Sequence, residues 1–288
     1  MKVKQLLGTG LGFRTENVDE ILETLPAIPW FEILIDNFMA DNASLSIVDR
    51  LIEHYPVSFH GVGLNIGSTS TLDFKYLAKL RRLEKRWNPR QISDHFAWTA
   101  TPEHRFHELM PLPFTEEAIQ TLVSKIMQVQ EYLDRQILLE NSSSYVAPPS
   151  EMTEWEFINE VCSRSECGLL LDVNNIHVNA FNHGFLVADY IDGIQLSNVQ
   201  EMHLAGYEDK GGYYFDSHGR PVADEVWVSY RQILMEIPNV PTLLEWDTDI
   251  PSLGILLDEI NKAELIRGNV HDNVCRSTTS ETKTCLAV

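Results

Sequence analysis

The sequence predicts a single (β/α)8 barrel of the xylose-isomerase-like type, and three observations carry this prediction. Eight short apolar runs recur along the 288 residues, with longer amphipathic stretches between them. Parallel neighbouring strands need crossover connections, and the amphipathic stretches provide them. A chain of this length suits one barrel domain, and a hydrophobic content of 44% is enough for a full core.

The eight predicted strands are short and are bounded by turn residues. They span residues 6–13, 31–38, 57–64, 92–98, 137–143, 168–178, 194–204 and 242–247. The first run carries alternating glycines at Gly8, Gly10 and Gly12, and no Gly-x-Gly-x-x-Gly motif opens a helix after it. Alternating glycines are typical of a strand that packs closely at a barrel wall, whereas a phosphate loop would favour an open, doubly wound sheet.

Predicted helices occupy most of the intervals between these strands. They span residues 15–25, 44–54, 71–87, 115–135, 153–165, 224–236 and 251–262, and the interval 183–190 is short for a crossover helix. Long loops at 99–114 and 205–222 follow the fourth and seventh strands, on the face that carries the active site in such barrels. We expect the barrel domain to span residues 1–264, with a polar, mobile tail at 265–288.

The charge balance argues against two classes of partner. With 42 acidic and 22 basic residues the formal net charge is −20, which disfavours nucleic acid and anionic membrane surfaces. The apolar runs are too short for a membrane span, and no signal peptide is evident, so a cytoplasmic protein is expected. The cysteines (Cys162, Cys167, Cys275 and Cys285) form no C-x-x-C pair, so disulfides are not expected.

Ionisable and amide side chains gather at the ends of the last six predicted strands and in the loop after the seventh. They are His60, Asp94, His95, Glu140, Asn141, Asp172, Asn174, Asn175, His177, Glu201, His203, Asp216, His218, Glu245 and Asp247. The carboxyl ends of barrel strands converge on one axis, and so many buried carboxylates would repel one another without cations. The pattern predicts two or three metal ions, and the mixture of imidazole and carboxylate suits Fe, Mn or Zn.

Each of these residues also has an ordinary structural explanation when it is considered singly. His60 can be a packed histidine within a strand, Asp94 and His95 can form a structural pair, and Asp172 can cap a turn. The repetition of such groups on consecutive strands favours the metal site.

Ten short motifs, in order along the chain, carry a resemblance to a known family. They are residues 8–14 (GTGLGFR), 30–32 (WFE), 59–67 (FHGVGLNIG), 93–95 (SDH), 139–141 (LEN), 172–175 (DVNN), 179–180 (NA), 201–206 (EMHLAG), 216–219 (DSHG) and 244–247 (LEWD). Together they resemble the multinuclear non-heme iron-dependent oxidase family, whose best-known members act in methanobactin biosynthesis. The resemblance covers residues 5–262.

The resemblance implies an enzyme that holds two or three irons of mixed Fe(II)/Fe(III) state and uses O2 as co-substrate. Its substrate would be a cysteine of a ribosomally synthesised precursor peptide, and many members work with a separate peptide-recognition partner. The implied ligands are His60, His95, Glu140, Asp172, Asn174, His177, His203, Asp216, His218 and Glu245. Asp94, Asn141 and Asn175 would not bind the metal themselves but would orient these ligands.

Two other classes remain open from the residues alone. A divalent-metal isomerase or hydrolase on a similar barrel, such as a sugar isomerase or an endonuclease, uses much the same ligands. The acidic balance disfavours the nuclease, and few lysines fall at strand ends, where a sugar isomerase is expected to have one. A non-catalytic scaffold is the third class, and it predicts that alanine at Glu140 or Glu245 is functionally silent.

Overall fold

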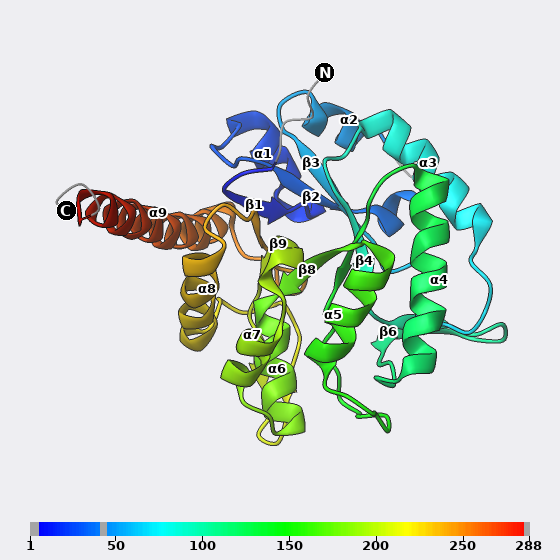
Figure 1. Cartoon of the computed structure of the whole chain (residues 1–288). Helices are drawn as coiled ribbons and strands as arrows, with labels where there is room; N and C mark the ends of the chain where they lie inside the picture. The colour runs from blue at the N-terminus through cyan, green and yellow to red at the C-terminus, as the bar shows by residue number, and fades with distance from the viewer. Residues whose placement is uncertain (1–5, 41–44, 285–288) are drawn as a thin grey trace.

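The structure is a computed structural model that describes residues 6–40 and 45–284, and it describes the backbone alone at residues 107 and 273–284. Its centre is a closed barrel of eight parallel strands (Figure 1). Along the chain these are β1 (Thr9–Gly12), β2 (Phe31–Leu34), β3 (Val57–His60), β4 (Ile92–His95), β7 (Leu138–Glu140), β8 (Gly168–Asp172), β9 (Val199–Leu204) and β12 (Thr242–Leu244). Consecutive barrel strands are neighbours, and β12 closes the barrel by pairing with β1. The predicted fold class is therefore confirmed.

Each predicted strand overlaps one barrel strand, although all eight predicted strands are too long. The second ends early because residues Ile35–Phe38 form a short 3-10 helix, η2. The sixth ends at Asp172, whose side chain accepts a hydrogen bond from the backbone NH of Asn175 and caps helix α6 (Val173–His183). The prediction that Asn174, Asn175 and His177 end a strand is wrong, because all three lie on α6.

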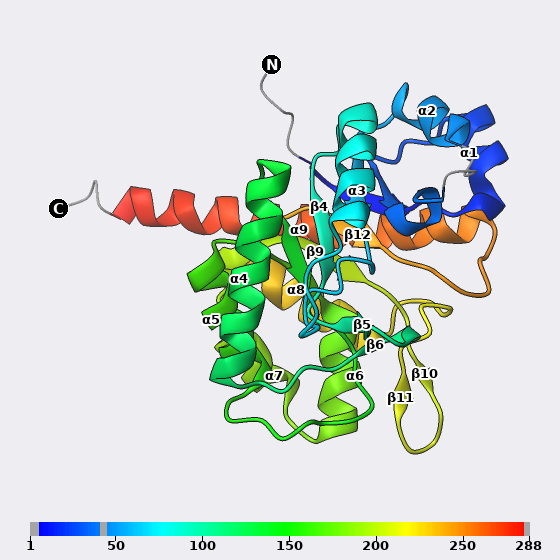
Figure 2. The same cartoon turned by 90° about the vertical axis from the view of Figure 1, so that its right-hand side faces the viewer.

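Helices surround the barrel and connect its strands (Figures 1 and 2). Besides α6 they are α1 (Val18–Thr24), α2 (Ser46–Ile52), α3 (Phe74–Trp87), α4 (Glu116–Leu133), α5 (Glu154–Ser165), α7 (Val187–Gly193), α8 (Asp224–Glu236) and α9 (Leu253–Thr284), with 3-10 turns η1 (Thr15–Asn17) and η3 (Leu196–Asn198). Thr115 caps α4, and Thr153 forms a capping box with Glu156 at α5. None of these helices has the length and apolar character that a membrane span requires.

Helix α9 does not end at the expected domain boundary. It continues past residue 264 to Thr284, and its far half projects from the barrel (Figure 1). Arg267 and Val270 are buried, and Arg267 donates a hydrogen bond to the Val240 carbonyl at 2.6 Å. Residues 265–270 therefore belong to the packed barrel. The thiols of Cys275 and Cys285 lie outside the described side chains.

Strand periodicity determines which side chains enter the barrel. Alternate residues of a strand face opposite sides of the sheet. Phe59 faces outward, where its ring meets Trp87 of α3 edge-on at 5.9 Å. Its neighbour His60 therefore faces the barrel axis, and the last inward position of each of five further strands also carries a polar residue. On β1, Gly10 leaves room for the Trp30 ring, which would lie 2.4 Å from a Cβ atom there.

Two antiparallel hairpins stand at the carboxyl end of the barrel (Figure 2). One pairs β5 (Trp98–Ala100) with β6 (Arg105–Met110), and the other pairs β10 (Glu208–Asp209) with β11 (Tyr214–Phe215). They lie within the two loops that the sequence singles out, after β4 and β9. The hairpins form walls above the strand ends.

Candidate metal centre

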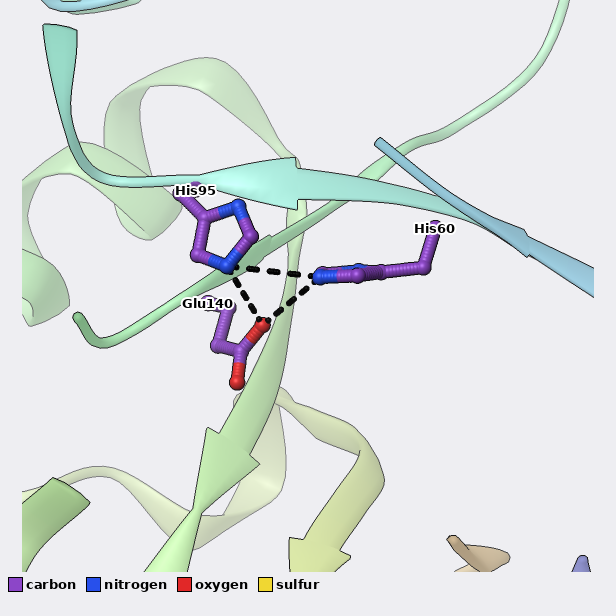
Figure 3. Close-up of side chains that lie close together, drawn as sticks. All are labelled: His60, His95 and Glu140. Atoms are coloured by element: carbon purple, nitrogen blue, oxygen red, sulfur yellow. Dashed lines mark hydrogen bonds and ion pairs between the residues drawn. The ribbon is translucent and has the colours of Figure 1, made fainter. Parts of the chain in front are cut away.

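Three of the predicted ligands meet at one point above β3, β4 and β7. Glu140 Oε2 lies 3.2 Å from His60 Nε2 and 3.1 Å from His95 Nε2, and the two imidazole nitrogens lie 3.3 Å apart (Figure 3). Figure 3 shows the three side chains pointing at one another from three strands. All three are buried. We call them the first triad.

The other nitrogen of each triad histidine has a protein partner. His60 Nδ1 lies 2.8 Å from the Ser93 hydroxyl, which itself donates to the Phe59 carbonyl. His95 Nδ1 lies 3.1 Å from the Gly61 carbonyl, to which only an N–H can donate. These contacts place a proton on each Nδ1, so Nε2 is the nitrogen that each imidazole can offer to a metal ion.

The spacing of the first triad fits a metal ion. Ligand atoms about 2.1 Å from a metal lie about 3.0 Å apart at a right angle and about 3.4 Å apart at the tetrahedral angle. The three observed separations, 3.1, 3.2 and 3.3 Å, fall between these values.

A second group of possible ligands shares Glu140 with the first triad. Its members, Glu140, Asp172, His203 and Glu245, offer ligand atoms within 4.8 Å of one another. His203 Nδ1 lies 3.4 Å from Glu140 Oε1 and 3.0 Å from Glu245 Oε2. Asp172 is fully buried, and its Oδ2 has no hydrogen-bond partner. A buried carboxylate oxygen without a donor fits a cation at this position.

A third group extends from Glu245 toward the mouth of the barrel. His218 Nδ1 lies 3.4 Å from Glu245 Oε2 and 3.3 Å from Asp247 Oδ2, and His218 Nε2 lies 2.6 Å from Asp216 Oδ1. His218 has a φ of 45°, in the left-handed region. A non-glycine residue held there stores strain, which is common where a side chain is positioned for function.

Glu140 and Glu245 thus join three groups into one continuous cluster, which we call the ligand layer. It consists of His60, His95, Glu140, Asp172, His203, Asp216, His218, Glu245 and Asp247. Because each bridging carboxylate has two oxygens, each can serve two neighbouring ions.

The close spacing of buried imidazoles and carboxylates in the ligand layer shifts their pKa values. Burial lowers the pKa of His60 to about 3, so this imidazole stays neutral. At His95 burial opposes the charged form, but the charge of Glu140 and its neighbours outweighs burial and raises the pKa to about 9. Burial also opposes the charge of Glu140, yet His203, His95 and His60 hold the pKa of its carboxyl well below the usual range.

Asp172 shows the opposite behaviour, since burial and the charge of Glu140 raise the pKa of its carboxyl well above the usual range. A neighbouring cation would supply the compensating charge.

The structure places the predicted supporting residues directly behind the ligands. Asp94 accepts hydrogen bonds from the backbone NH groups of His95 and Leu64, and burial raises its pKa to about 7. Asn141 accepts from the Asp172 backbone NH at 2.8 Å and donates to the Asp172 carbonyl at 3.0 Å. Asn175 donates to the Asn141 carbonyl at 3.0 Å.

Of the two predicted ligands on α6, Asn174 lies beside the ligand layer and His177 does not. Asn174 donates to Asp216 Oδ1 at 2.8 Å, and its own Oδ1 is buried without a partner, so it borders the ligand layer. His177 lies on another face of the helix, and its Nε2 is 3.0 Å from the Ser229 hydroxyl of α8. The structure does not bring His177 together with the other predicted ligands.

Two residues beside the ligand layer, Arg14 and Glu32, are absent from the strand-end pattern, and Glu201 belongs to that pattern but not to the implied ligands. Arg14 lies 3.6 Å from Glu245 Oε1 and makes a closer ion pair with Asp247. Glu32 and Glu201 are fully buried beneath His203. Strand parity is the signal that could have identified Glu32, because it lies two positions after the inward-facing Trp30. The same parity places Glu201 two positions before His203 on the inner face of β9.

A cavity of about 210 Å³ opens above the ligand layer. Its walls include Glu108 and Leu109 of β6, and Ser143 and Tyr145 after β7. A larger hollow of about 560 Å³ lies at the opposite end of the barrel, lined by Arg90, Gln91 and Pro238 among others. No group of possible metal ligands found within the described part of the chain includes these residues, so the chemistry belongs to the smaller cavity.

Comparison with known sequences gives matches that cover nearly the whole chain. A family model described as "RiPP precursor modification enzyme MbnB/TglH/ChrH" matches residues 8–267. A UPF0276 protein of Acaryochloris marina is 43% identical over 258 residues, which are 89% of this chain and 94% of that protein. A UPF0276 protein of Anaeromyxobacter sp. is 45% identical over 262 residues, 90% of this chain and 93% of that one.

Solved structures with the same barrel are much more distant in sequence. D-psicose 3-epimerase from Clostridium cellulolyticum superposes with a TM-score of 0.56 at 10% identity, covering 95% of this chain and 98% of that one. Endonuclease IV from Thermus thermophilus gives 0.53 at 13% identity, covering 92% and 99%. A xylose isomerase candidate from Rhodospirillum rubrum gives 0.58 at 12% identity, covering 91% and 99%. These likenesses confirm the xylose-isomerase-like fold and carry no activity with them.

Proposed function

The chain belongs to the RiPP precursor modification enzyme family MbnB/TglH/ChrH, and on this premise we propose that it is a multinuclear iron, O2-dependent oxidase. Its substrate would be a cysteine of a ribosomally synthesised precursor peptide. The observation that best supports the proposal is the ligand layer, in which Glu140 and Glu245 each belong to two groups of possible ligands. A layer with two bridging carboxylates suits several ions held side by side better than a single ion.

We assign three positions to the layer. His60, His95 and Glu140 would hold the first ion, Glu140, Asp172, His203 and Glu245 the second, and His218, Glu245 and Asp247 the third. Asp216 lies at the other ring nitrogen of His218. Imidazole and carboxylate ligands suit iron. Bound iron would supply redox chemistry with O2 and would favour the thiolate form of a substrate cysteine.

The residues around the layer prepare it for a peptide thiol. Ser143 donates a hydrogen bond to Asp216 at 2.8 Å, and Asn174 donates to the other oxygen, so the carboxylate is held in one orientation. Arg14 balances part of the charge of Glu245 and Asp247. Tyr145 and Leu109 line the cavity and give it apolar surface beside the polar strand ends. A separate peptide-recognition partner remains part of the proposal.

A divalent-metal isomerase or hydrolase is the second candidate, because such enzymes use much the same His, Asp and Glu ligands as the ligand layer offers. The two candidates differ in redox behaviour, since an isomerase or hydrolase needs no change in the oxidation state of its metal.

Anaerobic reconstitution with ferrous iron tests the proposal. The expected result is more than one iron per chain, followed by O2 consumption and a change in mass of a cysteine-containing precursor peptide on exposure to air. The precursor to use is a short cysteine-containing peptide encoded beside the gene. A protein that takes up no iron, or an iron-loaded protein that leaves every such peptide unchanged, would contradict the oxidase. Turnover of a sugar with Zn²⁺ or Mg²⁺ and without O2 would support the second candidate.

A further inference from the structure

A second buried acidic layer lies directly beneath His203. Glu32 and Glu201 have 1% and 0% of their surface exposed, and His203 has 0%. His203 Nε2 lies 3.4 Å from Glu32 Oε2 and 3.7 Å from Glu201 Oε1. The opposite ring nitrogen, Nδ1, faces Glu140 and Glu245. The imidazole of His203 therefore separates the ligand layer from two further carboxylates.

This placement follows from the barrel register. Glu201 and His203 are alternate residues of β9, so both face the axis, one above the other. Glu32 reaches the same level from β2, where its strand neighbour Ser58 donates a hydrogen bond to it at 3.4 Å. Three separate strands thus bring polar groups to a level of the barrel that is filled by apolar side chains in an ordinary packed core.

The polar atoms at this level lack ordinary partners. Both oxygens of Glu201 and the Nε2 of His203 are buried without a well-formed hydrogen bond. Two buried carboxylates are costly to a fold that gains nothing from them, since an apolar residue of similar volume would be at least as stable. Their position against one ring nitrogen indicates a purpose connected with His203.

We propose that Glu32 and Glu201 are positioning residues that hold the Nε2–H of His203, so that Nδ1 is the atom presented to the metal. The inference rests on the proposed function, because it requires ions in the ligand layer. A carboxylate that accepts the distal N–H of a ligand histidine fixes the tautomer and the ring orientation, and it makes the imidazole a stronger donor. The negative charge beneath the ring also favours the more highly charged state of the ion above it.

The alternative is a cation bound by Glu32, Glu201 and His203 Nε2, whose ligand atoms also lie within 4.8 Å of one another. That arrangement would require His203 to ligate through both nitrogens and hence to lose both protons. An N–H directed at Glu32, the nearer carboxylate at 3.4 Å, with the charge of Glu201 close by, needs only the neutral imidazole, so we favour positioning.

Leucine and glutamine variants of both carboxylates test the proposal. Glu201→Leu and Glu32→Leu remove the acceptor at similar volume, whereas Glu201→Gln and Glu32→Gln keep one oxygen that can accept from His203. Glu154→Gln is the matched control. Burial raises the pKa of Glu154 to about 7, but this carboxylate bonds to Asn179 and Tyr190, away from the ligand layer.

The first readout is the affinity of the full chain for Zn²⁺, measured against a competing chelator together with the number of ions bound. The second is the reduction potential of the iron-loaded protein, and the third is the unfolding of the metal-free protein in denaturant. We expect the leucine variants to bind Zn²⁺ about 10- to 100-fold more weakly, the glutamine variants to fall between them and wild type, and Glu154→Gln to match wild type. The potential should rise in the leucine variants, while the metal-free fold becomes more stable.

In the leucine variants the metal affinity should therefore fall while the stability of the metal-free fold rises. If Glu32 and Glu201 had only a structural role, the metal affinity would not fall. Leucine variants that keep wild-type affinity and potential would overturn the inference and leave the proposed function standing. Loss of one whole Zn²⁺ equivalent with the remaining sites unchanged would also overturn it, in favour of a cation beneath His203. A wild-type protein that binds neither Zn²⁺ nor iron would overturn both.

Discussion

Buried polar groups occur at both ends of this barrel, but they are compensated in different ways. At the amino end, Thr9 donates to Glu264 at 2.6 Å, Tyr230 donates to Thr242 at 3.2 Å, and Arg267 donates to the Val240 carbonyl. We call Thr9, Tyr230, Thr242, Glu264 and Arg267 the amino-end network. Its one carboxylate and one guanidinium lie 3.6 Å apart, and none of its buried polar atoms is without a partner.

The ligand layer at the carboxyl end has no such internal balance. Its carboxylates outnumber Arg14, the nearby cation, and Asp172 keeps a buried oxygen without a donor. The difference shows that the amino-end network is complete as a protein structure, whereas the ligand layer is neutralised only by charge taken up from solution, as protons on His95 and His203 or as bound cations. Four predictions test this difference, beginning with the largest expected effect.

Glu140→Ala removes the carboxylate that joins the first and second groups. Two of the three proposed ions lose a ligand, so we expect less iron per chain and a loss of activity of about 10³-fold, equivalent to several kcal/mol. Metal analysis and turnover of the precursor peptide measure the two effects. Glu131→Ala, at an exposed carboxylate on α4, is the control and should change neither. Full iron content in Glu140→Ala would remove Glu140 from the layer.

Arg267→Met should lower the stability of the fold and leave the iron content unchanged. It breaks the hydrogen bond of the buried guanidinium to the Val240 carbonyl, so the free energy of unfolding should fall by about 2 kcal/mol. The lost ion pair adds little, because Glu264 is exposed to solvent. Iron per folded chain should stay at the wild-type value. Denaturant unfolding of the metal-free protein measures the loss. The exposed neighbour Leu265→Ala should stay within about 0.5 kcal/mol of wild type. A loss of iron without a loss of stability in Arg267→Met would contradict the assignment of the amino-end network to fold stability alone.

The pH dependence of stability should also distinguish the ends. In the metal-free protein the pKa of His95 is about 9, above the ordinary histidine pKa of 6.5 that we take for the unfolded chain. The protonated imidazole therefore stabilises the fold fully below pH 6.5, and this contribution is lost as the pH rises through 9. We expect metal-free stability to decline across that window, and the metal-loaded protein to show no such decline. Calorimetry in buffers of different ionisation enthalpy should detect proton release on metal binding at pH 7.5. Binding without proton release would contradict the assignment of His95.

His177→Ala should have the smallest effect. The side chain bonds to Ser229 rather than to the ligand layer, so we expect unchanged iron content and a loss of about 1 kcal/mol of stability. Ser229→Ala should reproduce the stability change. If iron content drops by one ion in His177→Ala alone, His177 returns to the ligand set that the family resemblance implies.

Much of the ligand layer is predictable from the sequence because strand periodicity is local. His60, His95, Glu140, Asp172, His203 and Glu245 all stand at or just past strand ends, and a barrel must bring strand ends together. The sequence does not reveal that Asp172 ends its strand and caps a helix, which turns His177 away. From the sequence alone, an apolar run followed by Asn-Asn can continue as a strand or begin a helix. The packing of α6 against α8 decides for the helix.

By itself the sequence determined the barrel, its eight strands and the gathering of His, Asp and Glu at one end, since these follow from periodicity and composition. Tertiary structure alone decided the partners within that gathering. It made Glu140 and Glu245 shared members of the layer, placed Glu32 and Glu201 beneath His203, and completed the amino-end network with Arg267 from beyond the expected boundary. The physical reason is that periodicity specifies which face a side chain occupies, whereas the closure and register of the barrel set the distances across it.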